Sequence, residues 1–197
     1  MPREVELKSV VQDVAECRRR IEAAGARVVF EGQLDDRRYD TSDRRLAAGD
    51  NILRIRRFVG DGGEHATLEW KGPTRHEHGY KVRDEIIADV PDAAPLAAIL
   101  EKLGYAVVGE IDRGVAQYEL DGAVIRFERY PRMDALVEVE GPPDAIEQAI
   151  AALGLDRGGF SADRLPAFIA RFEQRTGTPA AVNVRQLRTA GRESTDG

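Results

Sequence analysis

Apolar and charged residues alternate along most of the chain with the period of two that is typical of β-strands. Glycine-containing turns separate the alternating segments, and Asp61-Gly62-Gly63 and Asp121-Gly122 are typical of hairpins. The pattern predicts strands over residues 2–10, 28–39, 52–59, 66–71, 80–90, 105–113, 116–121, 123–130 and 135–140. Because most of these strands follow one another through short turns, they indicate an antiparallel sheet or barrel.

A period close to that of an α-helix marks four other segments. They predict helices over residues 13–25, 93–104, 145–153 and 162–175. A few helices beside a predominantly antiparallel sheet favour an α+β fold. Residues 1–175 therefore form one predicted domain, and the polar, unpatterned residues 176–197 are expected to be a flexible tail.

The polar positions of the predicted strands are almost wholly charged. Glu4, Glu6 and Lys8 share one strand face, and a single face of this kind is most often simply solvated. The arrangement recurs, however, at Arg54 and Arg56, Glu69 and Lys71, Arg83 and Glu85, Arg126 and Glu128, and Glu138 and Glu140. An ordinary solvated face would also contain serine, threonine and glutamine. The recurrence therefore predicts that charged faces meet inside a barrel and that the apolar faces point outward beneath the helices, the reverse of the usual small barrel.

These faces, together with Arg113, place equal numbers of bases and acids in the predicted lumen. The basic residues are Lys8, Arg54, Arg56, Lys71, Arg83, Arg113 and Arg126, and the acidic residues are Glu4, Glu6, Glu69, Glu85, Glu128, Glu138 and Glu140. Buried charges are costly unless they are paired or bind a ligand. Guanidinium groups bind phosphate oxygens in pairs, and clustered carboxylates hold Mg²⁺ or Mn²⁺. A polyphosphate carrying divalent cations would satisfy both sets, as in phosphoryl transfer.

Composition narrows the class of protein. The chain has 197 residues with 29 basic and 35 acidic side chains, and its isoelectric point is about 5.3, unlike that of a strongly basic nucleic-acid-binding protein. It contains no apolar run long enough to cross a membrane. A single cysteine, Cys17, excludes an intrachain disulfide and a cysteine-based zinc site. We therefore expect a cytoplasmic monomer or homodimer without nucleic-acid or membrane partners.

Several short motifs occur in an order that resembles a known family. Residues 4–8 have the Glu-x-Glu-x-Lys pattern that opens members of the CYTH family, also called triphosphate tunnel metalloenzymes. Gln33-Leu34-Asp35 and Tyr39-Asp40-Thr41 resemble the family's Gln-x-Asp-x-Tyr-Phe-Asp stretch. The later motifs are Leu53-Arg54-Ile55-Arg56, Leu68-Glu69-Trp70-Lys71-Gly72-Pro73, Arg83-Asp84-Glu85, Arg113 and Glu138-Val139-Glu140. The resemblance covers roughly residues 2–170 and looks closest to the class IV adenylyl cyclase branch, which also includes hydrolases.

The resemblance implies an eight-stranded antiparallel β-barrel, the triphosphate tunnel, with flanking helices. It implies that a catalytic Mg²⁺ or Mn²⁺ is held by Glu4, Glu6, Glu138 and Glu140, that Glu128 joins them, and that Glu85 holds a second metal or orients a basic partner. The implied catalytic set is Glu4, Glu6 and Lys8. The residues expected to bind phosphate are Lys8, Arg54, Arg56, Lys71, Arg83, Arg113 and Arg126.

The sequence departs from the family pattern at three places. Glu128 is one methylene longer than the usual aspartate, Ile111 occupies a commonly basic position, and Ser161-Ala162 replaces a frequent Ser-Tyr step. These departures leave the reaction open. We expect metal-dependent hydrolysis of tripolyphosphate, thiamine triphosphate or a nucleoside triphosphate, because tripolyphosphate requires only phosphate and metal contacts. The alternatives are a class IV adenylyl cyclase, which makes cyclic AMP and pyrophosphate from ATP, and a non-catalytic polyphosphate-binding module.

Three further features have simpler interpretations. Cys17 lies on the apolar face of the first predicted helix and is interpreted as a core residue. His76-Glu77-His78 could ligate a metal but is interpreted as a polar loop. Arg37-Arg38 and Arg44-Arg45 could line a tunnel mouth and attract an anionic substrate, and an exposed loop is an equally good interpretation.

Overall fold

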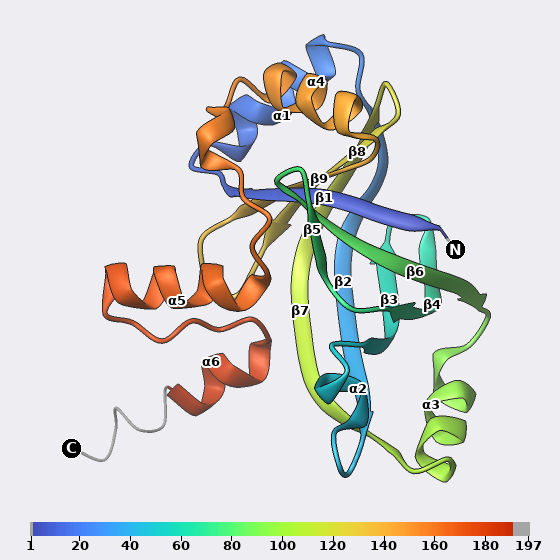
Figure 1. Ribbon diagram of the computed structural model, residues 1–197. Coiled ribbons are helices and arrows are strands. Elements are labelled where there is room, and N and C mark those ends of the chain that lie inside the picture. Colours follow the sequence, from blue (N-terminus) through green and yellow to red (C-terminus); the bar gives the residue numbers. More distant parts are fainter. Residues whose placement is uncertain (1, 191–197) are drawn as a thin grey trace.

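A computed structural model describes residues 2–190 as a closed antiparallel β-barrel surrounded by helices (Figure 1). Eight strands form the ring in the order β1-β9-β8-β7-β2-β3-β4-β6, and β6 pairs with β1 to close it. The strands are β1 (Arg3–Val10), β2 (Arg27–Thr41), β3 (Ile52–Gly60), β4 (Gly63–Lys71), β6 (Tyr80–Val90), β7 (Tyr105–Leu120), β8 (Ala123–Arg129) and β9 (Leu136–Glu140). A short extra strand, β5 (Arg75–Glu77), pairs with the start of β6. The predicted α+β barrel is confirmed.

One strand boundary differs from the prediction. Residues 105–113 and 116–121, which the sequence pattern separated, form the single long strand β7. Gly114 does not break it, because Gly114 stays extended and pairs with Gln33 on β2 and with Arg129 on β8. The long strands β2 and β7 pair along most of their length and form one wall of the barrel.

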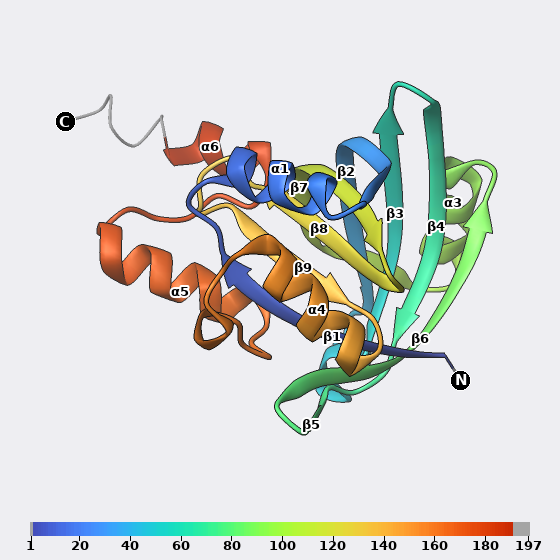
Figure 2. The same ribbon diagram turned by 90° about the horizontal axis from the view of Figure 1, so that it is seen from above.

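Helices cover the outside of the barrel near the predicted positions. They are α1 (Val14–Ala23), α3 (Ala93–Lys102), α4 (Pro143–Leu153) and α5 (Leu165–Thr176). Two short helices, α2 (Arg45–Ala48) and α6 (Val184–Ala190), and the 3₁₀ turn η1 (Arg157–Gly159) were not predicted. Viewed from above, α1 and α4 lie side by side over the strands β1, β8 and β9 (Figure 2).

The apolar faces of the strands point outward, as the sequence predicted. Leu7, Ile125 and Val139 are almost completely buried and pack with Cys17 of α1 and Ile146 of α4 in the largest hydrophobic cluster. The assignment of Cys17 to the core is therefore confirmed. A smaller cluster lies beneath α3, where Leu100 contacts Tyr39 and Ile55. The main cores thus lie between the barrel and its helices, and the lumen is left to charged residues.

The C-terminal segment corrects the predicted tail. After α5 ends at Thr176, the chain returns to the barrel, and the backbone of Ala181 pairs with that of Arg132. Ala181 and Val182 are buried, and the chain continues into α6. The expectation of a flexible tail is therefore wrong for residues 177–190. The segment is held by backbone hydrogen bonds, and such bonds do not require a regular pattern of apolar side chains that the sequence could show. Residues 191–197 lie outside the described residues.

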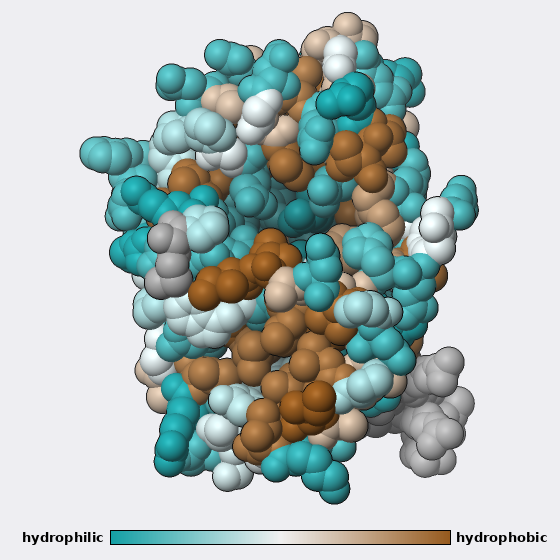
Figure 3. All heavy atoms as spheres, turned by 90° about the vertical axis from the view of Figure 1, so that its right-hand side faces the viewer, coloured by the Kyte–Doolittle hydropathy of each residue, from teal (hydrophilic) through white to brown (hydrophobic). Residues whose placement is uncertain are grey.

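Within residues 2–190, no helix has the length and apolar character needed to cross a lipid bilayer. Figure 3 shows an apolar area on the side of the molecule that carries β6 and α3. Exposed hydrophobic residues in or directly after these two elements are Ile86, Ile87, Ile99 and Leu103. Above this apolar area, the same view shows a hollow lined by hydrophilic side chains.

Candidate active site in the barrel tunnel

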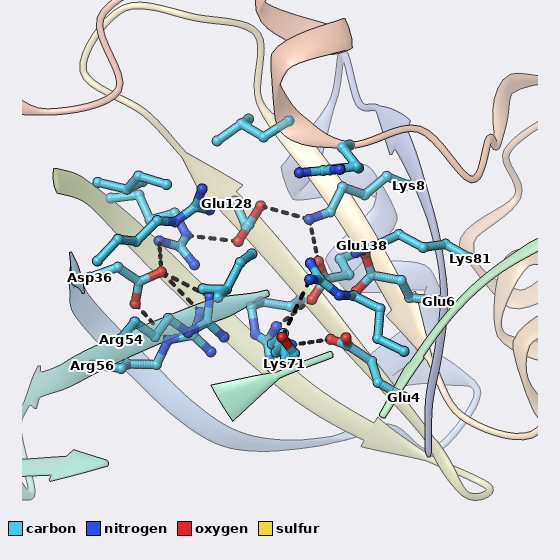
Figure 4. Close-up of a pocket in the computed structure, with 18 of the residues that line it drawn as sticks. Glu4, Glu6, Lys8, Asp36, Arg54, Arg56, Lys71, Lys81, Glu128 and Glu138 are labelled. Carbon is cyan, nitrogen blue, oxygen red and sulfur yellow. Dashed lines mark hydrogen bonds and ion pairs between the residues drawn. The ribbon is translucent and has the colours of Figure 1, made fainter. Parts of the chain in front are cut away.

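Charged side chains from all eight strands of the ring converge in the lumen (Figure 4). They contact one another so closely that the cavity between them is only about 90 Å³. The predicted site residues that line this cavity are Glu4, Glu6, Lys8, Arg54, Arg56, Lys71, Arg83, Arg113, Arg126, Glu128 and Glu138. Glu85 and Glu140 lie beside Glu4. The charged lumen that the alternation predicted is thus present in the fold.

Three carboxylates form a group that we call the carboxylate cluster: Glu4, Glu85 and Glu140. One oxygen from each lies within 4.8 Å of the others. They come from the adjacent strands β1, β6 and β9, whose register aligns Glu6 with Glu140 and Glu4 with Arg83. Glu4 therefore lies diagonally next to both Glu140 and Glu85. Strands that are far apart in the sequence build this cluster only when the barrel closes.

The carboxylate cluster has more acidic groups than cations. Lys71 pairs with Glu4 and lies 2.8 Å from Glu85, and Glu140 has no ion pair among the described residues. Lys71 and Lys81 outweigh the effect of burial and lower the pKa of Glu4 to about 2. Burial raises the pKa of Glu140 to about 7, and the nearby Glu4 and Glu138 contribute to this rise. The cluster therefore holds negative charge that the protein itself only partly neutralises.

The residues of the carboxylate cluster fit a divalent cation. The second oxygen of Glu4, Oε2, is buried and has no hydrogen-bond partner within residues 2–190. Carboxylate oxygens are the donors that Mg²⁺ and Mn²⁺ prefer, and a bound ion would satisfy this oxygen and the ionised form of Glu140. A buried polar atom without a partner is otherwise costly.

On the other side of the ring, basic residues surround one carboxylate in what we call the arginine cluster: Asp36 with Arg54, Arg56 and Arg113. Asp36 accepts hydrogen bonds from Arg56 at 2.7 and 3.1 Å, and from Arg54 and Arg113 at 3.2 Å each. Figure 4 shows Asp36 lying against Arg54 and Arg56. Although burial opposes ionisation, the three arginines hold the pKa of Asp36 well below its usual range. Asp36 holds the three guanidinium groups at the cavity, and Glu69 also pairs with Arg54 and Arg56.

A third set of contacts surrounds Lys8. Lys8 pairs with Glu138 and lies 3.9 Å from Glu128 (Figure 4). Glu138 also pairs with Arg126, and Glu6 pairs with Lys81. Glu128 accepts hydrogen bonds from Arg113 at 2.7 Å and from the Tyr130 hydroxyl at 2.7 Å. Glu6, Glu128 and Glu138 thus contact cations in the structure, and their assignment as metal ligands stays a prediction.

Arg83 makes contacts of a different kind. Its guanidinium donates to the backbone carbonyls of Gly72 and Asp50, both at 2.6 Å. Arg83 is the largest fully buried side chain, and burial lowers its pKa. These bonds tie the loops after β4 and before β3 to the tunnel wall. Its assignment as a phosphate ligand stays a prediction, and its present contacts are those of a residue that positions the loops.

The structure adds tunnel residues that the sequence motifs did not identify. Asp36 lines the cavity, whereas Asp35, which the motif resemblance selected, is half-buried and pairs weakly with Arg57 outside. Lys81 lies on the same face as Arg83 and Glu85, so the alternation along β6 could have revealed it. Tyr130 also lines the cavity and carries no charge that the pattern could flag.

Two of the open motif interpretations are now resolved. Arg38 lines the cavity, whereas its neighbour Arg37 points outward and pairs with Asp112 at 2.8 Å. His76-Glu77-His78 lies on β5 and the turn after it, and Glu77 pairs with Arg3 and Arg75. Among the described residues, the carboxylate cluster is the only group of acidic, histidine or cysteine side chains close enough to share a metal, and the histidine motif is not part of it.

A comparison of the sequence with models of protein families agrees with the ordered motifs and the charged tunnel. Residues 2–149 match the model of the CYTH domain. The chain belongs to the CYTH family. CYTH proteins are typically metal-dependent triphosphatases or cyclases that bind triphosphate substrates. The resemblance predicted from the sequence is therefore confirmed. A comparison with curated protein sequences gave no match.

Solved structures show the same fold. The chain is similar to the PH1819 protein of Pyrococcus horikoshii, with a TM-score of 0.70 and 22% identity over 85% of this chain and 98% of that one. It is similar to a Vibrio parahaemolyticus protein described as a candidate adenylate cyclase, with a TM-score of 0.72 and 19% identity over 85% and 97% of the two chains.

A third similar structure carries a description of its activity. It is the Hippeastrum protein HpAC1, a candidate adenylyl cyclase described as having a dominant triphosphatase activity. The TM-score is 0.60, with 15% identity over 90% of this chain and 97% of that one. At these identities the likeness of all three structures concerns the fold.

Proposed function

We propose that this CYTH protein is a divalent-metal-dependent hydrolase that cleaves a phosphoanhydride bond of a triphosphate-containing small molecule inside the tunnel. Candidate substrates are tripolyphosphate, thiamine triphosphate and nucleoside triphosphates. The observation that carries the proposal is the carboxylate cluster, in which Glu4 Oε2 lacks a partner and Glu140 lacks a cation, beside a cavity lined by arginines and lysines. A site that only bound polyphosphate would need the basic residues but not the carboxylates.

The residues have distinct roles in this proposal. Glu4, Glu85 and Glu140 would hold Mg²⁺ or Mn²⁺, which neutralises phosphate charge and orients the attacking water when it is bound. Arg54, Arg56 and Arg113 would bind non-bridging phosphate oxygens.

Charge exchange would let the substrate enter such a small cavity. Phosphate oxygens can replace carboxylates as partners of the tunnel cations. Each cation would then keep an anionic partner when the substrate binds. Lys8 and Arg126 now share Glu138 and would bind phosphate in this way. The fixed positions of these cations would hold the phosphate chain in line for attack on the terminal phosphorus.

Cyclisation of ATP is a second candidate, and the likeness to the Vibrio parahaemolyticus protein favours it. In that reaction the ribose 3′-hydroxyl attacks the α-phosphorus and pyrophosphate leaves. The description of the Hippeastrum protein supports hydrolysis instead. Both reactions use the same phosphate and metal contacts, so product analysis must separate them.

The test incubates the purified protein with Mg²⁺ or Mn²⁺ and, in separate reactions, with tripolyphosphate, thiamine triphosphate and ATP. Hydrolysis predicts orthophosphate without cyclic AMP, and loss of activity in EDTA. Cyclic AMP together with pyrophosphate would overturn the hydrolase proposal in favour of the cyclase. Tight binding of all three compounds without turnover would instead identify a non-catalytic binding module.

A further inference from the structure

One cation in the tunnel has no partner. The guanidinium of Arg38 makes no hydrogen bond or ion pair within the described part of the chain, and its Nε is shielded from solvent. The other tunnel arginines are satisfied: Arg54, Arg56 and Arg113 by Asp36, Arg126 by Glu138, and Arg83 by backbone carbonyls. Among the described residues, Arg38 is therefore the exception among the arginines of the lumen.

The neighbours of Arg38 increase the cost of its charge. In the β2–β3 register, Arg38 lies directly opposite Arg54. Like charges in this position repel each other. Burial lowers the pKa of Arg38 to about 10, and the adjacent Arg54 adds to the shift. Arg38 is half-buried, and a half-buried cation without a partner next to other cations destabilises the free protein. An anionic ligand would remove that cost.

The space around Arg38 can hold such a ligand. On β7 its register partner is Gly109, where no side chain fills the space. The cavity is also lined by Ile52, Ile111, Leu165 and Pro166. Apolar walls exclude water and strengthen the attraction between a guanidinium and an anion.

The position of Arg38 in the ring indicates what it binds. β2 lies on the opposite side of the barrel from β1, and Arg38 is two residues beyond Asp36 on that strand. Because Arg38 lies opposite Arg54, a phosphate chain bound to the arginine cluster would have a further phosphoryl group within reach of Arg38. Arg38 is thus placed to bind a phosphoryl group next to those held by the arginine cluster.

We propose that Arg38 forms an additional anion subsite that binds a fourth phosphoryl group, so that the protein prefers linear chains of at least four phosphoryl groups to triphosphates. The shared ligand chemistry is an oligophosphate chain, either inorganic or carried by a nucleoside. The direction of the chain rests on the proposed function, which places the metal end at the carboxylate cluster. The presence of an anion subsite at Arg38 rests only on the unpaired guanidinium and its cavity.

The test measures binding by titration calorimetry without divalent metal, so that no turnover is needed. Tripolyphosphate is compared with tetrapolyphosphate, and ATP with adenosine 5′-tetraphosphate, for the wild type, Arg38→Met and Arg38→Lys. Arg37→Met is the matched control, because Arg37 is the next residue of β2 and points away from the tunnel. The inorganic and nucleoside pairs distinguish the two sources of the phosphate chain.

We expect the wild type to bind the four-phosphate ligand of at least one pair about tenfold more tightly than its three-phosphate counterpart, as one charge-assisted contact would give. Arg38→Met should reduce this ratio toward one, Arg38→Lys should retain part of it, and Arg37→Met should keep it. A wild-type ratio near one, or an unchanged ratio in Arg38→Met, would overturn the subsite.

A stability measurement gives a second test. Without ligand, Arg38→Met should unfold at the same or a higher temperature than the wild type, because it removes an unpaired, half-buried charge. A clearly lower Tm would show that Arg38 is already satisfied and would contradict the inference. Failure of the hydrolase proposal is distinguishable, because a protein that prefers four phosphoryl groups but releases no orthophosphate would retain the subsite and lose the activity.

Discussion

The two sides of the tunnel contain the same kinds of charge but differ in how completely the charges are paired. In the arginine cluster Asp36 contacts all three arginines, and Glu69 and Glu128 pair with Arg54 and Arg113 as well. In the carboxylate cluster, Lys71 is the one cation within ion-pair distance of Glu4 and Glu85 among the described residues, and Glu140 has none. One side therefore holds arginines in paired contacts at the cavity, and the other has oxygen ligands left over for a cation.

The difference shows that the role of an acidic residue in the tunnel depends on how many cations surround it. Asp36 and Glu140 are both acidic and both belong to the tunnel wall. The arginines hold the pKa of Asp36 far below its usual range against the effect of burial, whereas burial raises that of Glu140 to about 7. Asp36 thus acts as a fixed counterion, while Glu140 changes its charge near neutral pH.

Removing a ligand from the carboxylate cluster should have the largest effect. Glu4→Gln should lower the turnover of the best triphosphate substrate about 1000-fold, because loss of a bound metal removes several kcal/mol of transition-state stabilisation. Phosphate release at saturating Mg²⁺ measures this change, and calorimetric titration with Mn²⁺ measures metal affinity. The control is Glu64→Gln, an exposed glutamate paired with Arg57. Unchanged metal affinity in Glu4→Gln would contradict the assignment of the metal to this cluster.

Removing the counterion of the arginine cluster should have the next largest effect. Asp36→Asn leaves three buried guanidinium groups without their shared carboxylate, and should lower the free energy of unfolding by about 3 kcal/mol. Urea denaturation measures the loss. Asp35→Asn, one residue away on the outer face, is the matched control and should change stability little. Tripolyphosphate should restore part of the loss in Asp36→Asn, since it neutralises the same arginines. Equal losses in the two variants would contradict the comparison.

The charge of Glu140 should make stability depend on pH. Because folding raises its pKa from the ordinary 4.5 to about 7, the folded protein binds this proton more tightly than the unfolded chain. The stability that the folded protein gains from binding this proton is fully present below pH 4.5 and is lost as the pH rises through 7. Glu140→Gln should therefore stabilise the metal-free protein at pH 8, by about 3 kcal/mol at most, and change little at pH 4.5.

Thermal unfolding at several pH values, with and without Mg²⁺, measures this effect. Mg²⁺ should remove the advantage of Glu140→Gln, because the variant loses an oxygen ligand that the ion can use in the wild type. If the difference in unfolding temperature between the variant and the wild type did not change with pH, Glu140 would not titrate between pH 4.5 and 8.

The smallest effect concerns a hydrogen bond at the edge of the arginine cluster. The Tyr130 hydroxyl donates to Glu128, which also accepts from Arg113 of the arginine cluster. Tyr130→Phe removes one donor from a buried carboxylate and should cost about 1 kcal/mol of stability. Thermal unfolding measures the cost, and KM for tripolyphosphate should rise if Glu128 positions Arg113. No change in either quantity would show that this hydrogen bond does not contribute.

Much of the fold could be predicted because strand alternation depends on local sequence. Val5 and Leu7 between Glu4, Glu6 and Lys8 already place apolar and charged residues on opposite faces, and the same rule identified most tunnel residues. The rule could not choose a face at Asp35-Asp36-Arg37-Arg38, because each of the two possible faces carries one aspartate and one arginine. Only the pairing of β2 with β3 and β7 shows that Asp36 and Arg38 face the tunnel.

The sequence by itself determined the family, the strand faces and the kinds of charge in the lumen, because each depends on residues close together in the chain. Tertiary structure decided which charges remain unpaired. Glu4, Glu85 and Glu140 meet because β6 and β9 flank β1, and Arg38 is left without a carboxylate because its neighbours on β3 and β7 are Arg54 and Gly109. Which charges meet and which stay unpaired depends on the register between strands that are distant in the sequence. No local pattern specifies this register.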